Sequence, residues 1–321
     1  MSKTFDDLLS KVASCSLKKL SVANAADDAV IDAVRAAKDR NIADAILVGN
    51  ETEIKKIAAD KGIDISDFEI IHEEDPIAAA RTAVKLVHDG KADMYMKGLI
   101  DTKSFLKSVL DKEVGLRTDK TLSHVCVFEI EGCDRLLFLT DVAFVPYPDL
   151  ETKVHIIENT VEIARACGIE CPKVAPIAAV EVVNPKMPVT VEAEQLTKMC
   201  EEGKIKNCIV DGPLSFDLAY DKEAAKHKGA EGRKIVGDAD VLLFPDQVRM
   251  SARPGRKVPD SPEALPQCWH AFSVHQTDGG YKYPYAPKVL PYEALLRSAP
   301  QFPDCLYPAA SSFSPYNKAS S

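Results

Sequence analysis

Lys97 and Gly98 follow the apolar run Met-Tyr-Met, and a predicted helix begins within a few residues, capped by Asp101 or Thr102. A glycine just beyond a strand lets the backbone turn and approach a ligand closely. The first N–H groups of the next helix have no partners inside the helix and carry partial positive charge. Lys97 adds a full charge. This junction therefore predicts an anion-binding site, and a strand end with a solvated lysine is the alternative reading.

Four further polar side chains follow near predicted loop and strand ends: Arg117, Ser123, His124 and Asp141. Arg117 belongs to the basic loop KEVGLRTDK and can offer a planar fork of donors to a phosphate or carboxylate. The number of such residues within one stretch, 94–144, favours a functional site over a solvated junction.

Composition excludes several classes of protein. The chain has 321 residues, which predicts two domains or one large one, and its 46% hydrophobic content is ample for a core. A net charge of −9 argues against nucleic acid and anionic membranes as partners. The nine cysteines are scattered without a CxxC pair, so no metal site is predicted. With no apolar run near the roughly 20 residues of a membrane span and no signal-peptide core, a cytoplasmic protein is expected.

Strands alternate with helices in the first part of the chain. The pattern predicts strands at 19–24, 45–49, 68–71 and 94–97, and helices at 26–40, 51–61 and 76–88. Such alternation is typical of an α/β fold with a parallel sheet covered on both faces. Ligands bind beyond the carboxyl ends of the strands in such sheets, which is where Lys97 and Gly98 are placed.

The next segment has a different pattern. Residues 121–131 and 134–141 are joined only by Gly132-Cys133, which predicts an antiparallel hairpin. A second alternating unit follows, with helices at 149–166, 190–202 and 222–228 and strands at 173–179, 207–211 and 239–244. We therefore predict a first α/β domain at 1–145 and a second at 146–246.

The last segment, 247–321, departs from this pattern. It holds 11 of the 20 prolines, the single tryptophan and six of the nine tyrosines, and no isoleucine. Its apolar content is under the level that supports a core of its own. We expect a proline-rich, atypical and poorly ordered tail.

Several motifs together resemble the phosphate acetyl/butyryltransferase family: MKGLIDT, FLKSVLDKEVGLRT, LSHVCVFEI, DRLLFLTDVAF, PDLETKVHIIENTVEIA, AAVEVVNPKMP and IVDGPL. The resemblance covers about residues 19–246. It implies two α/β domains with a cleft between them, as in isocitrate and isopropylmalate dehydrogenases, with largely parallel sheets. It also implies transfer of an acyl group between coenzyme A and inorganic phosphate, with coenzyme A as a substrate. No metal or redox cofactor is expected. Members of this family usually form homo-oligomers.

The resemblance assigns roles to particular residues. Lys97, Arg117 and Asp141 are expected to be catalytic. Substrate binding is expected of Gly98, Thr102, Lys107, Ser123, His124, Asn184 and Lys186. Structural readings stay open for four of the ten: Asp141 as a helix cap, His124 as a core histidine, Lys107 as a solvated residue and Asn184 as a turn former.

One departure from the family bears on activity. After Asp246 the family continues with Ala-Gly-Asn, a Tyr-Lys pair and a Ser-Arg-Ala-Asp stretch, and none of these is present in this chain. Residues 247–321 read like an out-of-frame translation of that ending. Butyryl is the expected acyl group. The alternatives are an inactive frame variant, a phosphate acetyltransferase, or a binding module that uses the anion site without turnover.

Overall fold

The computed structural model describes residues 3–130, 132–246, 276–277 and 280–281. The predicted atypical tail, 247–321, lies outside the described residues apart from the short pair β10 (Gln276–Thr277) and β11 (Gly280–Tyr281). Within the described part, no helix is both long and apolar enough to span a bilayer.

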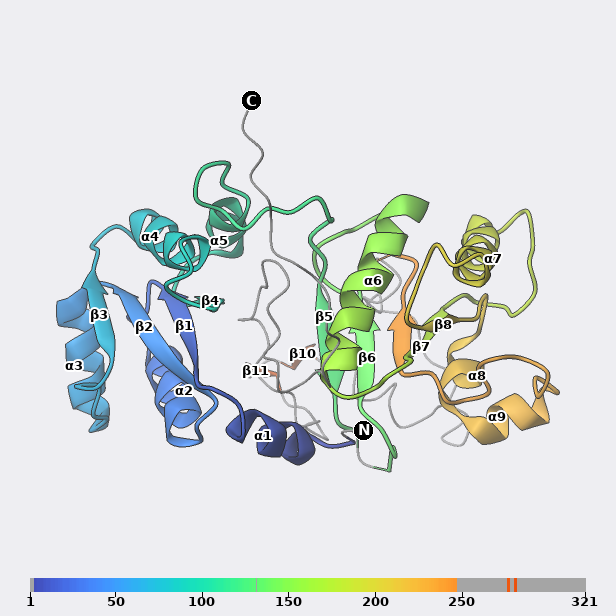
Figure 1. The fold of residues 1–321 in the computed structure, drawn as a ribbon, viewed down its shortest axis with the longest axis horizontal. Helices are drawn as coiled ribbons and strands as arrows, with labels where there is room; N and C mark the ends of the chain where they lie inside the picture. The colour runs from blue at the N-terminus through green and yellow to red at the C-terminus, as the bar shows by residue number, and fades with distance from the viewer. Residues whose placement is uncertain (1–2, 131, 247–275, 278–279, 282–321) are drawn as a thin grey trace.

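The first sheet is parallel, with strand order β3-β2-β1-β4 (Figure 1). Its strands are β1 (Lys18–Ala23), β2 (Ala43–Gly49), β3 (Glu69–His72) and β4 (Met94–Lys97). Its helices are α2 (Asp28–Asp39), α3 (Glu51–Lys61), α4 (Pro76–His88) and α5 (Thr102–Val109). Apolar side chains of α2 and α3 pack on one face, and those of α4 and α5 on the other. The predicted parallel sheet with two covered faces is confirmed.

Local sequence signals explain where these helices begin and end. Asp27, Asn50, Asp75 and Asp101 are N-caps whose side chains accept hydrogen bonds from N–H groups of the first turn. Gly62 ends α3 with a φ of 66°, a left-handed conformation that glycine adopts without strain. The predicted boundaries of α3 and α4 agree with the structure.

The second sheet is mixed, with strand order β5-β6-β9-β7-β8. Its strands are β5 (Val125–Phe128), β6 (Leu137–Thr140), β7 (Lys173–Pro176), β8 (Ile209–Val210) and β9 (Val241–Leu243). The hairpin β5–β6 is antiparallel as predicted, although both strands are shorter than expected. Strand β6 of the hairpin pairs with β9 of the second sheet, whereas we expected the hairpin to belong to the unit 1–145. The domain limits 1–145 and 146–246 themselves stay a prediction.

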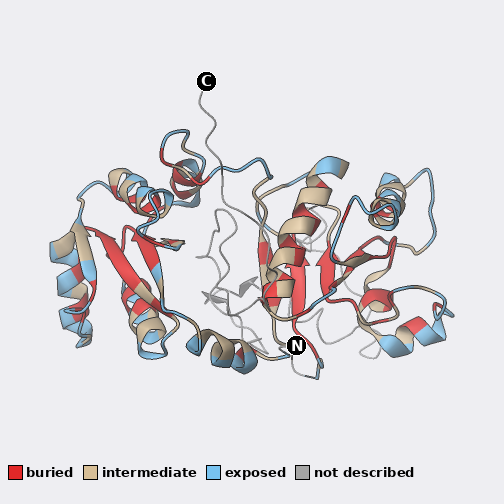
Figure 2. Cartoon of the chain, in the orientation of Figure 1, coloured by how far each residue is buried: buried red, intermediate tan, exposed pale blue. Residues whose placement is uncertain are grey.

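Helices cover both faces of the second sheet as well. The first face carries α1 (Phe5–Ala13), α6 (Leu150–Ala166) and α7 (Pro188–Glu201), and the second carries α8 (Phe216–Tyr220) and α9 (Lys222–His227). Neither α1 nor α8 was predicted from the sequence. Phe5 of α1 is buried in the core of the second sheet, and its N–H donates to Oε2 of Glu129 at 2.7 Å. Buried residues concentrate in the strands of both sheets (Figure 2).

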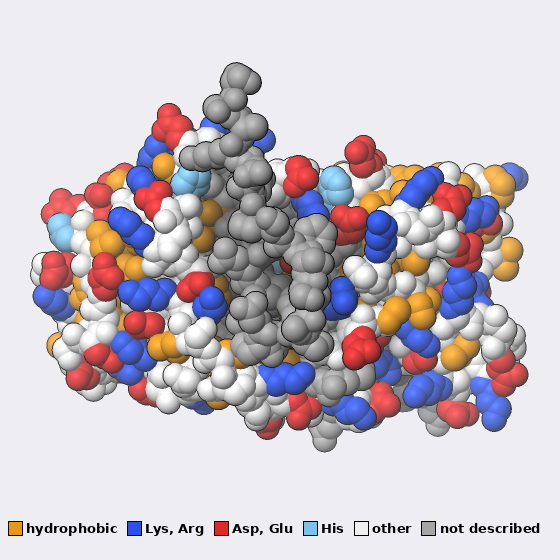
Figure 3. Space-filling model, in the orientation of Figure 1, with side chains coloured by type: hydrophobic (Ala, Val, Ile, Leu, Met, Phe, Trp, Pro, Cys, Tyr) orange, Lys and Arg blue, Asp and Glu red, His pale blue; other side chains and the backbone are white. Residues whose placement is uncertain are grey.

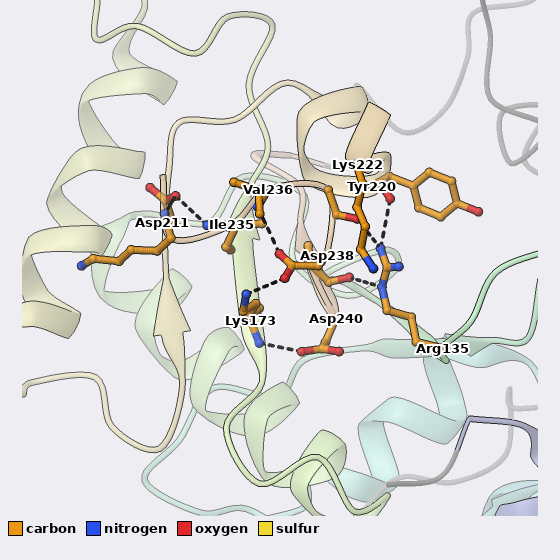
Figure 4. Close-up of polar contacts among 12 residues, drawn as sticks. Arg135, Lys173, Asp211, Tyr220, Lys222, Ile235, Val236, Asp238 and Asp240 are labelled. Carbon is orange, nitrogen blue, oxygen red and sulfur yellow. Dashed lines mark hydrogen bonds and ion pairs between the residues drawn. The ribbon is translucent and has the colours of Figure 1, made fainter. Parts of the chain in front are cut away.

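A polar network connects β6, β7 and β9 of the second sheet near their amino ends (Figure 4). The buried Arg135 donates to the carbonyl oxygens of Tyr220, Gly237 and Ala239. The Lys173 ammonium pairs with Asp238 at 2.6 Å, and the Lys173 N–H donates to Asp240 at 2.8 Å. Burial raises the pKa of the Asp240 carboxyl above its usual value. Partial burial acts in the same direction on Asp238, but the bonds from Lys173 and Val236 outweigh it and hold the pKa of Asp238 below its usual value.

These opposite shifts predict opposite effects of two matched substitutions. A raised pKa means that folding favours the protonated form, so the contribution of Asp240 is full below the unfolded-state pKa and is lost as pH rises through the folded value. Asp240→Asn should therefore raise the free energy of unfolding at pH 7. The contribution of Asp238 is present above its unfolded pKa and is lost as pH falls through the folded value. Asp238→Asn should therefore lower the free energy of unfolding at pH 7 by about 1 kcal/mol, through the loss of its charged hydrogen bonds.

Urea unfolding of both variants at pH 7 and pH 4 measures the two effects. The gain from Asp240→Asn should shrink at pH 4, because the raised pKa of Asp240 brings its wild-type carboxyl towards protonation there. The loss from Asp238→Asn should persist at pH 4, because the pKa of Asp238 is lowered. Equal destabilisation by both substitutions at pH 7 would contradict the assigned shifts.

Candidate functional site

The junction between β4 and α5 is built as the sequence predicted. Lys97 is the last residue of β4, pairs with Ala23 of β1 and is half-buried. Asp101 is the N-cap of α5, accepts from the Ser104 N–H at 2.9 Å, and Thr102 is the first helical residue. The bonds from Ser104 lower the pKa of Asp101.

Gly98 has a packing role that sequence reasoning did not identify. A Cβ at this position would overlap the carbonyl oxygens of Ala23 and Asn24, well inside van der Waals contact. The Gly98 N–H donates to the Ala23 carbonyl at 2.9 Å. The buried Asn24, at a φ of 55°, donates from its side chain to the Leu99 carbonyl. Glycine is therefore required here for the close approach of β1, whatever ligand the junction binds.

Arg117 lies on the connection that runs from the first sheet to the second. Leu116 is buried in the core of the first sheet, whereas Asn159 of α6 donates to the Thr121 carbonyl and to Ser123 Oγ at 3.0 and 2.9 Å. Arg117 itself is exposed. Its position between the two cores follows from these anchors on either side.

Asp141 is almost fully buried after the end of β6, with 2% of its surface exposed. One oxygen accepts from the N–H groups of Ala143 and Phe144, each at 2.8 Å, and the other accepts from the His124 N–H at 3.0 Å. It caps a turn and ties that turn to β5, and no helix begins there. The His124 ring packs edge-on against Phe144 and is half-buried, so it is not a core histidine.

Asn184 and Lys107 lie at a turn and near a helix end. Asn184 shapes a turn before α7, because its Oδ1 accepts from the Lys186 N–H and its own N–H donates to Thr190 Oγ1, each at 2.9 Å. Lys107 is exposed in the last turn of α5. Within residues 3–130 and 132–246, no hydrogen bond or ion pair joins Lys97, Arg117 and Asp141 to one another. Their convergence on one cleft stays a prediction.

Lys186 belongs to a cavity of about 350 Å³ at the carboxyl end of β9. Its lining comes from the segment before α6, the start of α7 and the end of β9: Tyr147, Pro148, Lys153, Lys186, Met187, Pro188, Val189, Glu192, Pro245 and Asp246. This is the position at which open α/β sheets bind ligands. Sequence reasoning missed Lys153 and Glu192. The available signal was helical spacing: Lys153 lies three residues before Ile156 and four before Ile157, so it shares the buried face of α6 with them.

Electrostatics and metal chemistry add two observations. On the face drawn in Figure 3, acidic and basic side chains are interspersed over both halves of the molecule. Among the described residues, no group of three or more His, Cys, Asp or Glu side chains is placed to hold a metal ion.

Comparison with solved structures identifies the class of this fold. A branched-chain phosphotransacylase from Enterococcus faecalis V583 aligns with a TM-score of 0.63 and 32% identity, over 73% of this chain and 81% of that one. A phosphotransacetylase from Staphylococcus aureus, at 23% identity, aligns with the same TM-score and supports the fold alone. The fold is that of the phosphotransacylases.

The chain belongs to the phosphate acetyl/butaryl transferase family, whose model matches residues 4–79 and 74–248. It is 57% identical over 246 residues to a phosphate butyryltransferase of Clostridium acetobutylicum, covering 77% of this chain and 81% of the relative. It is 44% identical over 229 residues to a phosphate acetyltransferase of Thermotoga maritima, covering 71% and 77%. The predicted resemblance is confirmed, and the family match ends at residue 248, where the composition changes.

Proposed function

We propose that this chain transfers an acyl group between coenzyme A and inorganic phosphate, with butyryl as the acyl group. The identity of 57% to a phosphate butyryltransferase over 246 residues carries the proposal, since it exceeds the 44% to a phosphate acetyltransferase. Coenzyme A and phosphate are then substrates, and no cofactor takes part.

The reaction requires an anion to attack an electrophile. A phosphate oxygen attacks the thioester carbonyl carbon, the carbon–sulfur bond breaks as the carbon–oxygen bond forms, and the thiolate of coenzyme A leaves and takes up a proton. In this proposal Lys97, Arg117 and the start of α5 hold phosphate and offset the developing oxyanion charge. In the same proposal Ser123 and His124 bind the phosphate and acyl end, and Asp141, Asn184 and Lys186 act from across the cleft. Gly98, Thr102 and Lys107 also bind substrate. Holding both reactants together supplies much of the remaining acceleration.

Release of free thiol from butyryl-CoA, with and without phosphate, tests this function. Phosphate-dependent release faster with butyryl-CoA than with acetyl-CoA is expected. Faster release from acetyl-CoA would identify a phosphate acetyltransferase instead. Absence of release from a folded protein would reject the proposal.

Lys97 provides a residue-level prediction. Removing a charge-assisted contact to phosphate costs about 1.5–3 kcal/mol, so Lys97→Met should lower kcat/KM for phosphate by about 10- to 100-fold. Lys91→Met, which removes an exposed lysine before β4, is the matched control and should leave kcat/KM unchanged. Equal effects of the two substitutions would argue against a role for Lys97.

The composition change at residue 247 and the end of the family match at 248 favour a second candidate, an inactive frame variant of the same enzyme. The coding DNA decides between them. A one- or two-base shift that restores Ala-Gly-Asn and Ser-Arg-Ala-Asp supports the frame variant, and an intact frame rejects it.

The proposal extends to the state and location of the protein. We propose a homo-oligomer in the cytoplasm, following the family resemblance and the scattered cysteines. Light scattering coupled to size exclusion tests the first point, and a monomer would reject it.

A further inference from the structure

The cavity at the carboxyl end of β9 is lined by several charged side chains. Its volume of about 350 Å³ is within the range of small-molecule sites, roughly 300–1,000 Å³. Two lysines, Lys153 and Lys186, line it together with Glu192 and Asp246. Lys186 is exposed at the rim, whereas Lys153 lies inside.

Lys153 is buried to an unusual extent for a lysine. Only 6% of its side-chain surface is exposed, and its ammonium group forms an ion pair with Glu192 of α7. Lysine is almost never fully buried without a partner, because removing its charge from water costs several kcal/mol. The Glu192 side chain, 34% exposed, is the more accessible member of the pair. An incoming anion can therefore take its place beside Lys153.

The start of α7 adds positive potential to the same cavity. Met187 is the N-cap and provides no side-chain hydrogen bond to the first turn. Pro188 at the first helical position has no N–H, and the Thr190 N–H donates to the Met187 carbonyl at 2.9 Å, so the helix dipole is the main contribution of this end. Met187, Pro188 and Val189 line the cavity. A helix start carries partial positive charge, which favours a bound anion. Thus the buried lysine, the rim lysine and an uncapped helix start lie around one hollow.

We propose that this cavity binds a phosphate group, with Lys153 as the cation inside it, Lys186 at its rim, and Glu192 as the partner of Lys153 when the site is empty. The inference rests on the proposed function, because both acyl acceptor and acyl donor in that reaction carry phosphate. Inorganic phosphate and the phosphates of coenzyme A present the same chemistry, and the experiment separates them.

Substitution of the two members of the ion pair should change ligand affinity in opposite directions, which distinguishes a binding site from a structural ion pair. Calorimetric titration with inorganic phosphate, and separately with coenzyme A, measures affinity without turnover. Lys153→Met should weaken binding of the ligand that occupies the cavity by about tenfold or more, the usual effect of one charge-assisted bond. Glu192→Gln should tighten it by at least about threefold, because the carboxylate no longer competes for Lys153. Lys198→Met removes an exposed ion pair of the same helix and should change neither affinity.

A purely structural ion pair would give a different pattern. Both substitutions would then weaken binding, or neither would change it, and either result would overturn the proposal. If Lys153→Met does not fold, Glu192→Gln decides alone: unchanged or weaker binding rejects the site. Failure of both ligands to bind the wild-type chain also rejects it.

These outcomes are separate from those of the acyl-transfer assay. Turnover with an unchanged phosphate KM and unchanged coenzyme A affinity in Lys153→Met would leave the proposed function intact and reject the site. Absence of turnover, together with phosphate binding that Lys153→Met abolishes, would support the site and reject the function.

Discussion

Replacing Gly98 with alanine should lower the free energy of unfolding by about 3 kcal/mol, or prevent folding of the first sheet. The added methyl group would enter space that the carbonyl oxygens of Ala23 and Asn24 already fill. Backbone atoms cannot rotate aside as a flexible side chain does, so β4 must move away from β1. The register that places Lys97 opposite Ala23 would be lost with it.

Gly232 offers the matched control. Nothing lies within 4 Å of the position that its Cβ would occupy, so Gly232→Ala should change stability by less than about 0.5 kcal/mol. Urea unfolding of both variants, followed by circular dichroism, measures the difference. Similar midpoints for the two would contradict the close approach between β1 and β4.

Replacing Asp141 with alanine should cost about 3–5 kcal/mol of stability. Three backbone N–H groups, those of His124, Ala143 and Phe144, would lose their acceptor at a position that is 98% buried. Asp141→Asn should cost less than half as much, since its remaining carbonyl oxygen can still accept from Ala143 and Phe144. Only the bond from His124 is then lost.

This series also tests the predicted catalytic role of Asp141. An Asp141→Ala variant with wild-type stability and no acyl transfer would show that the carboxylate acts on the substrate and that the turn holds without it. Acyl transfer that falls only in proportion to the stability lost, from asparagine to alanine, would show that Asp141 has a structural role alone. Chemical denaturation and thiol release on the same samples distinguish the two results.

The sequence was most informative where local signals determine structure. The predicted helices 51–61 and 76–88 are confirmed, with Gly62 directly after the first and Pro76 at the start of the second. Of the two expected caps for α5, Asp101 is the one observed. Alternation of strands and helices likewise predicted both covered sheets. These inferences depend on residues within a few positions of one another.

Long-range features were less accessible. The short connection between β5 and β6 predicted that these strands pair with each other. It could not predict which sheet the hairpin joins, because β6 pairs with β9, about 100 residues later. Burial of Lys153 depends on Glu192, 39 residues away, so the lysine alone reads as solvated. Gly98 was expected to let the backbone approach a ligand, which stays a prediction. The close approach that the structure shows at Gly98 is to the carbonyl oxygens of Ala23 and Asn24, more than 70 residues earlier in the chain.

The placement of α1 has a mechanical consequence. Because Phe5 is anchored in the core of the second sheet, the chain passes to the first sheet at residues 14–17 and returns at 117–124. Within residues 3–130 and 132–246, two separate tethers thus join the halves, and a swing of one half would twist both of them together. Such a doubly tethered body pivots about the line through its tethers and resists rotation about other axes.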